Sequence, residues 1–168
     1  MKKNSMVLFV LVLIIASCKK ETAAVCNFQP VNISAPAAEK DSLQRYLNAH
    51  NIYNTTRDTT GVFYTITSPG TGSVMPVLCS YLKTNYGGYL LENGSSFTNG
   101  VVPGSFTLGD LIPAWQKVLP LVRAGGSITM YVPPSLAYGS TPKYNASGVV
   151  VIPANSYLKF TVDIIEVQ

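Results

Sequence analysis

Residues 125–139 read Gly-Gly-Ser-Ile-Thr-Met-Tyr-Val-Pro-Pro-Ser-Leu-Ala-Tyr-Gly, and this stretch holds the signals that decide the fold. The glycine pair suits the end of a preceding helix, because glycine adopts the left-handed backbone common at helix C-termini. Ser127 to Val132 is predicted to be a strand, and Pro133-Pro134 ends it. The stretch therefore predicts a helix end, a strand and a loop in direct succession.

The flanking sequence extends this prediction to a sheet with one helix. Upstream, Asp110 to Val122 repeats apolar residues at helical spacing, namely Leu111, Trp115, Val118, Leu119 and Val122. Downstream, Tyr157 to Val167 alternates as a half-buried strand does. Val62 to Thr67 is β-rich, and strands flank a hairpin turn at Glu92-Asn93-Gly94, with Gly87-Gly88 as an interruption. The expected fold class is α+β, a twisted antiparallel β-sheet with one short α-helix.

A series of motifs runs in order from Gly61 to Gln168, over about 108 residues. They are Gly61-Val62-Phe63-Tyr64 with Pro69-Gly70-Thr71-Gly72, Tyr86-Gly87-Gly88-Tyr89-Leu90, Asn93-Gly94-Ser95-Ser96-Phe97, Phe106-Thr107-Leu108-Gly109 with Leu111-Ile112-Pro113-Ala114-Trp115, Pro133 to Gly139, and Ile152 to Phe160. This order and spacing resemble the FKBP-type peptidyl-prolyl isomerase domain. The resemblance implies a half-barrel sheet wrapped around a short helix, and isomerase activity.

The implied reaction needs an apolar pocket more than it needs acids or bases. Rotation about a peptide bond crosses about 18–20 kcal/mol because resonance is lost in the twisted state. A catalyst must bind the twisted amide better than the planar one. The twisted amide loses its dipolar resonance form, so a dry site suits it. Aromatic residues for such a pocket are plentiful in this sequence.

The resemblance also implies roles for particular residues. Trp115 would lie under the proline ring, and the Tyr138 hydroxyl and the Ile112 backbone N–H would each meet a substrate carbonyl. The expected catalytic residues are Tyr86, Phe97, Ile112, Trp115 and Tyr138; the expected substrate-binding residues are Thr98, Leu111, Ile152 and Phe160. For the apolar members, the alternative is an ordinary place in the core, and for Tyr138 it is a loop tyrosine satisfied by water.

The chain departs from the family pattern at several places, among them a hairpin turn that is one residue longer. Thr98 stands where the family usually carries an aspartate after the hairpin phenylalanine, so a carboxylate that braces the pocket is missing. The aromatic residue often found two positions before Phe106 is also missing. The loop from Gly139 to Val151 is longer than in compact members. These departures predict weak to moderate isomerase activity.

The N-terminus has the pattern of a targeting signal. Met1-Lys2-Lys3 precedes an unbroken apolar run from Met6 to Ile15, which is shorter than the roughly 20 residues that span a bilayer as a helix. Ile15-Ala16-Ser17-Cys18 fits a bacterial lipobox, in which the cysteine receives the lipid. Residues 1–17 are therefore expected to be a lipoprotein signal peptide and Cys18 the lipid attachment site. The alternative is an ordinary signal peptide with a cysteine near its cleavage site.

The expected domain organisation places three segments after the signal. Residues 18–35 are a flexible tether, 36–60 a short N-terminal helical arm, and 61–168 the isomerase domain. In the arm, Leu43, Tyr46 and Leu47 form a narrow apolar stripe, Ser34 is a candidate cap, and His50 falls near the helix end. The arm is too short for a long dimerisation helix, so it packs on the domain or acts as a spacer, and we expect a monomer.

Composition excludes several kinds of site. The chain has one histidine and three cysteines, which is too few for a multi-ligand zinc site or a histidine-based triad, so no metal or cofactor is expected. Lys and Arg are scattered, so no nucleic-acid patch is expected. After Cys18 becomes the N-terminus, Cys26 and Cys79 remain. A disulfide between them and two separate thiols are equally compatible with the sequence.

Three functions remain open. The first is a lipid-anchored peptidyl-prolyl isomerase of the cell envelope, at the periplasmic face or surface of the outer membrane, acting on proline-containing exported polypeptides. The second is a catalytically weak FKBP-like binding module that recognises a proline-containing partner segment. The third is a structural lipoprotein, in which the hydroxyl of Tyr138 has little use.

Overall fold

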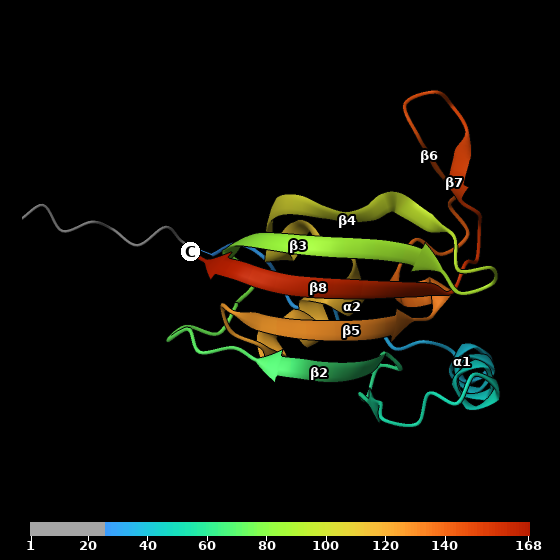
Figure 1. Cartoon of the computed structure of the whole chain (residues 1–168), viewed down its shortest axis with the longest axis horizontal. Helices are drawn as coiled ribbons and strands as arrows, with labels where there is room; N and C mark the ends of the chain where they lie inside the picture. Colours follow the sequence, from blue (N-terminus) through green and yellow to red (C-terminus); the bar gives the residue numbers. More distant parts are fainter. Residues whose placement is uncertain (1–25) are drawn as a thin grey trace, which may run out of the picture.

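Six antiparallel strands form one twisted sheet, and a short helix packs across one of its faces (Figure 1). This computed structural model describes residues 26–168. The sheet order is β1-β2-β5-β8-β3-β4. Its strands are β1 (Thr56–Arg57), β2 (Phe63–Pro69), β3 (Tyr81–Leu90), β4 (Ser96–Thr107), β5 (Gly126–Val132) and β8 (Leu158–Val167). The expected α+β class is confirmed.

The central helix is shorter than its apolar spacing predicts. The expected helix from Asp110 to Val122 is instead a 3₁₀ turn η1 (Leu108–Asp110), the helix α2 (Pro113–Val118) and a second 3₁₀ turn η2 (Leu119–Leu121). Pro113 begins α2, where its missing N–H costs nothing, and Pro120 cannot donate to continue the α-helical bonding. Leu111 and Ile112 therefore lie in an extended segment before the helix.

Strand β3 is continuous, although a break at Gly87-Gly88 was predicted. The register with β4 shifts between Gly87 and Tyr89, which accommodates the glycines as an irregularity within the strand. Gly88 is required there because an added Cβ would lie 2.2 Å from Cε2 of Phe97. The glycine lets the Phe97 ring lie flat against the strand.

The helical arm packs on the domain through α1 (Ala37–Ala49). Leu43 and Leu47 are buried in a cluster with Phe63, Leu91 and Tyr131. The Glu39 carboxylate accepts hydrogen bonds from the backbone N–H and the hydroxyl of Ser135, at 3.0 and 2.8 Å. The arm is therefore part of the folded body.

The two ends of α1 differ in how well the sequence predicted them. Ser34 does not cap the helix: its hydroxyl donates to the Thr60 carbonyl, and Pro36 occupies the N-cap position. His50 follows the last helical residue, as expected, with its ring stacked on Tyr46 at 4.0 Å. It is the C-cap of α1, not part of a metal cluster among residues 26–168.

Residues 26–35 differ from the expected flexible tether. Cys26 forms a disulfide with Cys79, and the Ala35 N–H donates to the Thr60 carbonyl at 2.8 Å. The Phe28 ring covers Gly109, where an added Cβ would lie 2.3 Å from the ring. This segment is thus held against the domain at both ends. The signal peptide (1–17) and Cys18 lie outside the described residues.

A second, two-stranded sheet lies beyond the main one. Strands β6 (Lys143–Tyr144) and β7 (Val150–Ile152) form a hairpin that projects from the body (Figure 1). It belongs to the long loop between the 3₁₀ turn η3 (Pro134–Leu136) and β8. Within the described part of the chain, no helix has the length and apolar character needed to cross a membrane.

Candidate active site

A cavity of about 390 Å³ opens between α2, the strands β3, β4 and β8, and the loops that follow η1 and η3. It brings together all the catalytic and substrate-binding residues expected from the sequence. It also includes three residues that were not expected in the site, Phe106, Asp110 and Lys143. The lining residues are Tyr86, Phe97, Thr98, Phe106, Asp110, Leu111, Ile112, Trp115, Tyr138, Lys143, Ile152 and Phe160.

Trp115 is held at the base of this cavity by the edges of other aromatic rings. Its ring centroid lies 5.5 Å from that of Tyr86 and 5.4 Å from that of Phe160, both nearly perpendicular to it. Phe106 makes a third perpendicular contact at 6.2 Å. The indole N–H finds no acceptor among the described residues. Ring contacts rather than a hydrogen bond therefore fix the orientation of Trp115.

Phe106 supplies the aromatic side chain that seemed to be missing from β4. An added Cβ on Gly104 would lie 2.3 Å from Cε2 of Phe106, so the Phe106 ring covers Gly104. Both residues face the same side of the strand, two positions apart. The ring fills the space that an aromatic side chain at position 104 would need. The glycine shows only that position 104 leaves space, and nothing in the sequence identifies Phe106 as the residue that fills it.

The segment before α2 offers a free backbone donor. The Ile112 N–H donates to no acceptor within residues 26–168, whereas the Leu111 N–H is bonded to Leu108. Gln116 supports the segment from inside, because its Nε2 donates to the carbonyls of Gly109 and Leu111 at 3.0 and 2.7 Å. Gln116 was not predicted; α2 contains two polar residues, Gln116 and Lys117, and the sequence did not show which of them supports the site.

Tyr138 also lines the cavity and is half-buried. Burial, and secondarily the neighbouring Tyr86, raises the pKa of the Tyr138 phenol above its usual value. The Lys143 ammonium lies 5.0 Å from the centroid of the Tyr138 ring, a cation–π contact. The phenol therefore stays protonated, and so able to donate, across the physiological pH range.

Thr98 replaces the expected carboxylate with hydrogen bonds to the backbone. Its hydroxyl oxygen accepts from the Gly88 N–H at 2.9 Å and the hydroxyl donates to the Gly100 carbonyl at 2.6 Å. It thereby ties β4 to β3 beside the cavity. The sequence showed only that the carboxylate was absent; the structure shows a different brace.

This brace gives a prediction for position 98. Thr98→Val keeps the shape and removes both hydrogen bonds, so the free energy of unfolding should fall by about 1–2 kcal/mol, while Thr98→Ser should stay near wild type. Thr98→Asp places a carboxylate against the Gly100 carbonyl, so it should be less stable and should not raise isomerase activity. Thermal unfolding and X-Pro exchange rates measure these outcomes. A more active Thr98→Asp protein of unchanged stability would contradict the account.

Comparison with known proteins places this geometry in a family. The family model described as "FKBP-type peptidyl-prolyl cis-trans isomerase" matches residues 73–165. A protein named FKBP-type peptidyl-prolyl cis-trans isomerase FkpA, from Escherichia coli K12, is 36% identical over 112 residues, covering 65% of this chain and 38% of that protein. Peptidyl-prolyl cis-trans isomerase Mip from Coxiella burnetii is 35% identical over 111 residues, covering 64% and 45%.

Solved structures agree with the sequence relatives. The crystal structure of FkpA from Escherichia coli superposes with a TM-score of 0.63 at 31% identity, covering 79% of this chain and 60% of that one. A peptidyl-prolyl isomerase from Pseudomonas syringae, at 22% identity and a TM-score of 0.62, shares the fold. The match to FkpA spans 38% of that protein's length, and the match to Mip spans 45%.

Proposed function

Because this chain belongs to the FKBP-type peptidyl-prolyl cis-trans isomerase family, we propose that it accelerates rotation about X-Pro peptide bonds in polypeptide substrates. The observation that carries the proposal is the aromatic cavity itself. Three aromatic rings pack nearly perpendicular to the Trp115 ring, and the rotation needs no acid–base group inside the cavity. Such a cavity, lined mostly by apolar and aromatic side chains, has room for a proline ring together with the residues that flank it.

The reaction follows from differential binding of the twisted amide. A proline ring held against Trp115 is fixed on one side of the X-Pro bond. The Ile112 N–H then donates to a substrate carbonyl, and Tyr138 donates to another. The dry cavity favours the twisted amide, which has lost its dipolar resonance form, over the planar one. Rotation proceeds without a covalent intermediate or a proton transfer.

The deciding experiment measures cis–trans exchange of a short X-Pro peptide by NMR with and without the protein. We expect acceleration proportional to protein concentration. Trp115 is the only tryptophan in the chain, so its fluorescence reports binding of the same peptide independently of turnover. A fluorescence change without acceleration would establish the binding module instead. If neither the exchange rate nor the fluorescence changes, the results would favour the third function, a structural lipoprotein.

Tyr138 gives a prediction with a pH dependence. Because its pKa is raised by burial, the neutral phenol persists to higher pH, and exchange should stay flat from about pH 6 to pH 9. Tyr138→Phe should lower kcat/KM about fivefold, the value of one hydrogen bond. Tyr53→Phe is the control, because Tyr53 is an exposed tyrosine that does not line the cavity. A rate that fell between pH 7 and 9 only in the presence of Tyr138 would contradict this assignment.

The place of action is part of the same proposal. A lipid on Cys18 would hold the protein, as a monomer, at a membrane of the cell envelope, where exported polypeptides fold. The N-terminal lipobox pattern supports it, and so does the Cys26–Cys79 disulfide, since such bonds persist in oxidising compartments. Metabolic labelling with a fatty-acid analogue tests it: label that survives Cys18→Ala would refute attachment at this residue.

A further inference from the structure

The loop between β2 and β3 exposes large apolar side chains. Val74 is 55% exposed, Met75 42% and Val77 61%. Residues 70–79, which we call the apolar loop, contain no charged side chain. Large apolar side chains exposed close together mark a contact surface more often than scattered ones do. The apolar loop is therefore a candidate docking surface.

The apolar loop is ordered by contacts of its own. The Arg123 guanidinium donates to the backbone carbonyls of Gly72 and Ser73 at 3.2 and 2.8 Å. The Ser80 hydroxyl oxygen accepts from the Val77 N–H at 3.2 Å, and the Ser80 N–H donates to the Val77 carbonyl at 2.8 Å. The apolar side chains are thus presented on a fixed backbone, which lowers the entropic cost of docking.

The apolar loop is tied to the segment that follows the expected lipid site. Its Cys79 forms the disulfide with Cys26, with 5.7 Å between the two Cα atoms. Cys26 follows Cys18 by eight positions, and eight residues reach at most about 29 Å. A lipid on Cys18 would therefore keep Cys79 within a short distance of the bilayer. The bilayer is thus the surface that the chain itself would hold beside this loop.

The surroundings of the apolar loop are basic. A groove of about 280 Å³ runs from the loop to α2 and η2, with Lys117 in its lining, and Arg123 contacts the loop directly. Neither the loop nor α2 or η2 contains an acidic residue. Of the acidic residues on β8, Glu166 pairs with Lys83 at 2.6 Å and Asp163 accepts from a serine hydroxyl. Basic side chains around an apolar loop suit a bilayer that contains anionic lipids.

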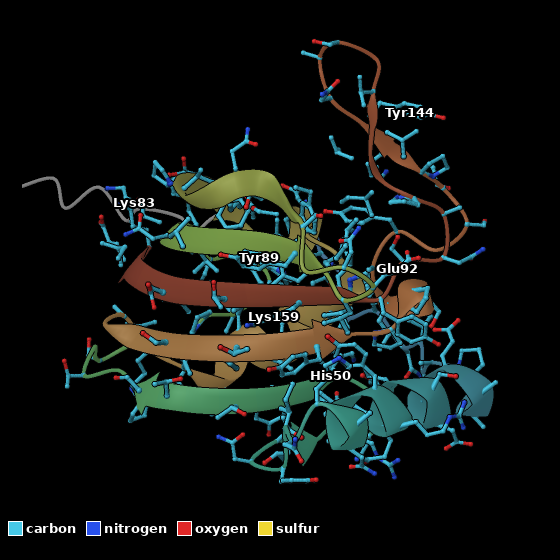
Figure 2. All side chains as sticks on the ribbon, turned by 45° about the vertical axis from the view of Figure 1, so that its right-hand side comes forward. His50, Lys83, Tyr89, Glu92, Tyr144 and Lys159 are labelled. Carbon is cyan, nitrogen blue, oxygen red and sulfur yellow. A yellow bond between two sulfur atoms is a disulfide. The ribbon has the colours of Figure 1, made fainter. Side chains whose placement is uncertain are left out.

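Docking of the apolar loop fixes which way the cavity faces. The loop joins β2 and β3 at one end of the sheet, and the β6–β7 hairpin projects from the other end (Figure 1). Figure 2 labels Lys83, near the start of β3, and Tyr144, on the hairpin, at these two ends. The base residues of the hairpin, Lys143 and Ile152, line the cavity. A bilayer against the loop therefore leaves the hairpin side of the cavity open to the aqueous phase.

We propose that the apolar loop docks on the bilayer that carries the Cys18 lipid, with Val74, Met75 and Val77 inserted at the lipid–water interface. This inference rests on the proposed lipid attachment and adds an orientation of the domain to it. The short connection from Cys18 and the basic residues beside the loop favour an anionic bilayer over a second copy of the chain or a soluble protein. The domain then lies on the membrane in one orientation, with its cavity accessible to polypeptides in the aqueous phase.

Oxidation of Met75 by a water-soluble peroxide tests the docking. Of the two methionines within residues 26–168, Met75 is exposed and Met130 is buried. Val150→Met adds a reporter on the hairpin, at a position that is 45% exposed against 42% for Met75. The lipid-bearing protein is placed in vesicles of phosphatidylethanolamine and phosphatidylglycerol, and mass spectrometry measures oxidation at both positions. The reference is the same mature chain without lipid, produced as Cys18→Ala behind an ordinary signal peptide.

We expect Met75 in vesicles to be oxidised about tenfold more slowly than in the lipid-free chain, because a side chain inserted at the interface is withdrawn from water. Oxidation at position 150 should be the same in both proteins. Val74→Ser with Val77→Ser should return Met75 to the lipid-free rate. Val101→Ser with Val149→Ser removes two valines of similar exposure elsewhere, so this matched control should keep Met75 protected.

Several results would overturn the docking. Equal oxidation rates of Met75 with and without lipid would show that the loop stays in water, and equal protection at both positions would show that the shielding is not specific to this loop. Protection in the lipid-free chain that is lost on dilution would assign the loop to a second copy of the chain. Protection there that is independent of concentration would show that the chain itself covers the loop.

Lipid attachment, docking and isomerase activity have separate readouts. The mass of the N-terminal peptide reports the lipid, and X-Pro exchange reports the activity. If Cys18 carries no lipid, the proposed location fails and the docking fails with it. If Cys18 carries the lipid and Met75 is unprotected, only the docking fails. Equal unfolding temperatures of wild type and the valine variants confirm that folding is intact, since all the valines altered are exposed.

Discussion

Replacing Trp115 with alanine is expected to lower kcat/KM for X-Pro isomerisation about thirtyfold. A proline ring over the indole buries two or three methylene groups, and each contributes about 0.8 kcal/mol. Losing about 2 kcal/mol of that contact corresponds to about thirtyfold in rate. The loss appears in kcat/KM whether the contact forms in the ground state or only in the transition state.

The variant must be separated from simple unfolding. Trp115 is 4% exposed, and removing so large a buried side chain should also cost about 3–5 kcal/mol of stability. Phe63→Ala is the matched control, because Phe63 is 2% exposed and belongs to the other buried cluster, with Leu43 and Leu47. It should lose comparable stability but little kcat/KM once rates are corrected for the folded fraction. The kcat/KM of Trp115→Phe should fall between that of Trp115→Ala and that of the wild type.

A Trp115 variant with full activity at its folded fraction would contradict the role given to this ring. The chain would then hold its proline elsewhere, and the family pocket would be a core feature only. If Phe63→Ala lost as much corrected activity as Trp115→Ala, the loss would reflect general loosening of the fold. The two results together therefore test the site, not the stability.

The sequence was sufficient to place the expected site residues around one cavity. The motifs at Tyr86, Phe97, Trp115 and Tyr138 lie on two strands, a helix and a loop, and the order of these motifs was enough to predict that they meet. The strand alternation of Leu158, Phe160, Val162 and Ile164 was confirmed, because a sheet with one buried face imposes a period of two. Roles within the cavity stay predictions.

Other features depended on shape that no local pattern carries. The Phe106 ring covers Gly104 because the ring leans along its strand, and a missing side chain at position 104 does not say which neighbour fills the space. The helix predicted from Asp110 to Val122 was too long at both ends, because α2 spans only Pro113–Val118. The apolar spacing predicted a longer helix, whereas the two prolines, Pro113 and Pro120, limit it. Lys143 reaches the cavity through a hairpin whose path the sequence did not fix.

The segment at residues 26–35 shows the same limit for long-range contacts. Its sequence has no hydrophobic periodicity, which is typical of a tether. Its cysteine nevertheless forms a disulfide with Cys79, 53 positions away. Sequence gives the presence of two cysteines but not the 5.7 Å between their Cα atoms. The disulfide and the Thr60 carbonyl hold the segment that carries Phe28 and Ala35 against the domain.

Removing the Cys26–Cys79 bond is expected to lower the free energy of unfolding by about 4 kcal/mol. The bond closes a loop with a sequence separation of 53, and the entropy that such a loop regains in the unfolded chain gives this value. Thermal and denaturant unfolding, with and without reductant, measure it. The Cys26→Ser, Cys79→Ser double variant should match the reduced wild type and should not respond to reductant. An equal response of both proteins to reductant would contradict the assignment.

Activity should respond far less than stability, because the site loop has supports of its own. Phe28 covers Gly109, which precedes the cavity residues Asp110 and Leu111. The Gly109 N–H, however, donates to the Leu78 carbonyl at 2.7 Å, and Gln116 holds the Gly109 and Leu111 carbonyls from within. Well below the unfolding temperature, kcat/KM of the double variant should therefore stay within about twofold of wild type. A larger loss, reproduced by Phe28→Ala with the disulfide intact, would show instead that the N-terminal segment positions the loop that carries the Ile112 donor.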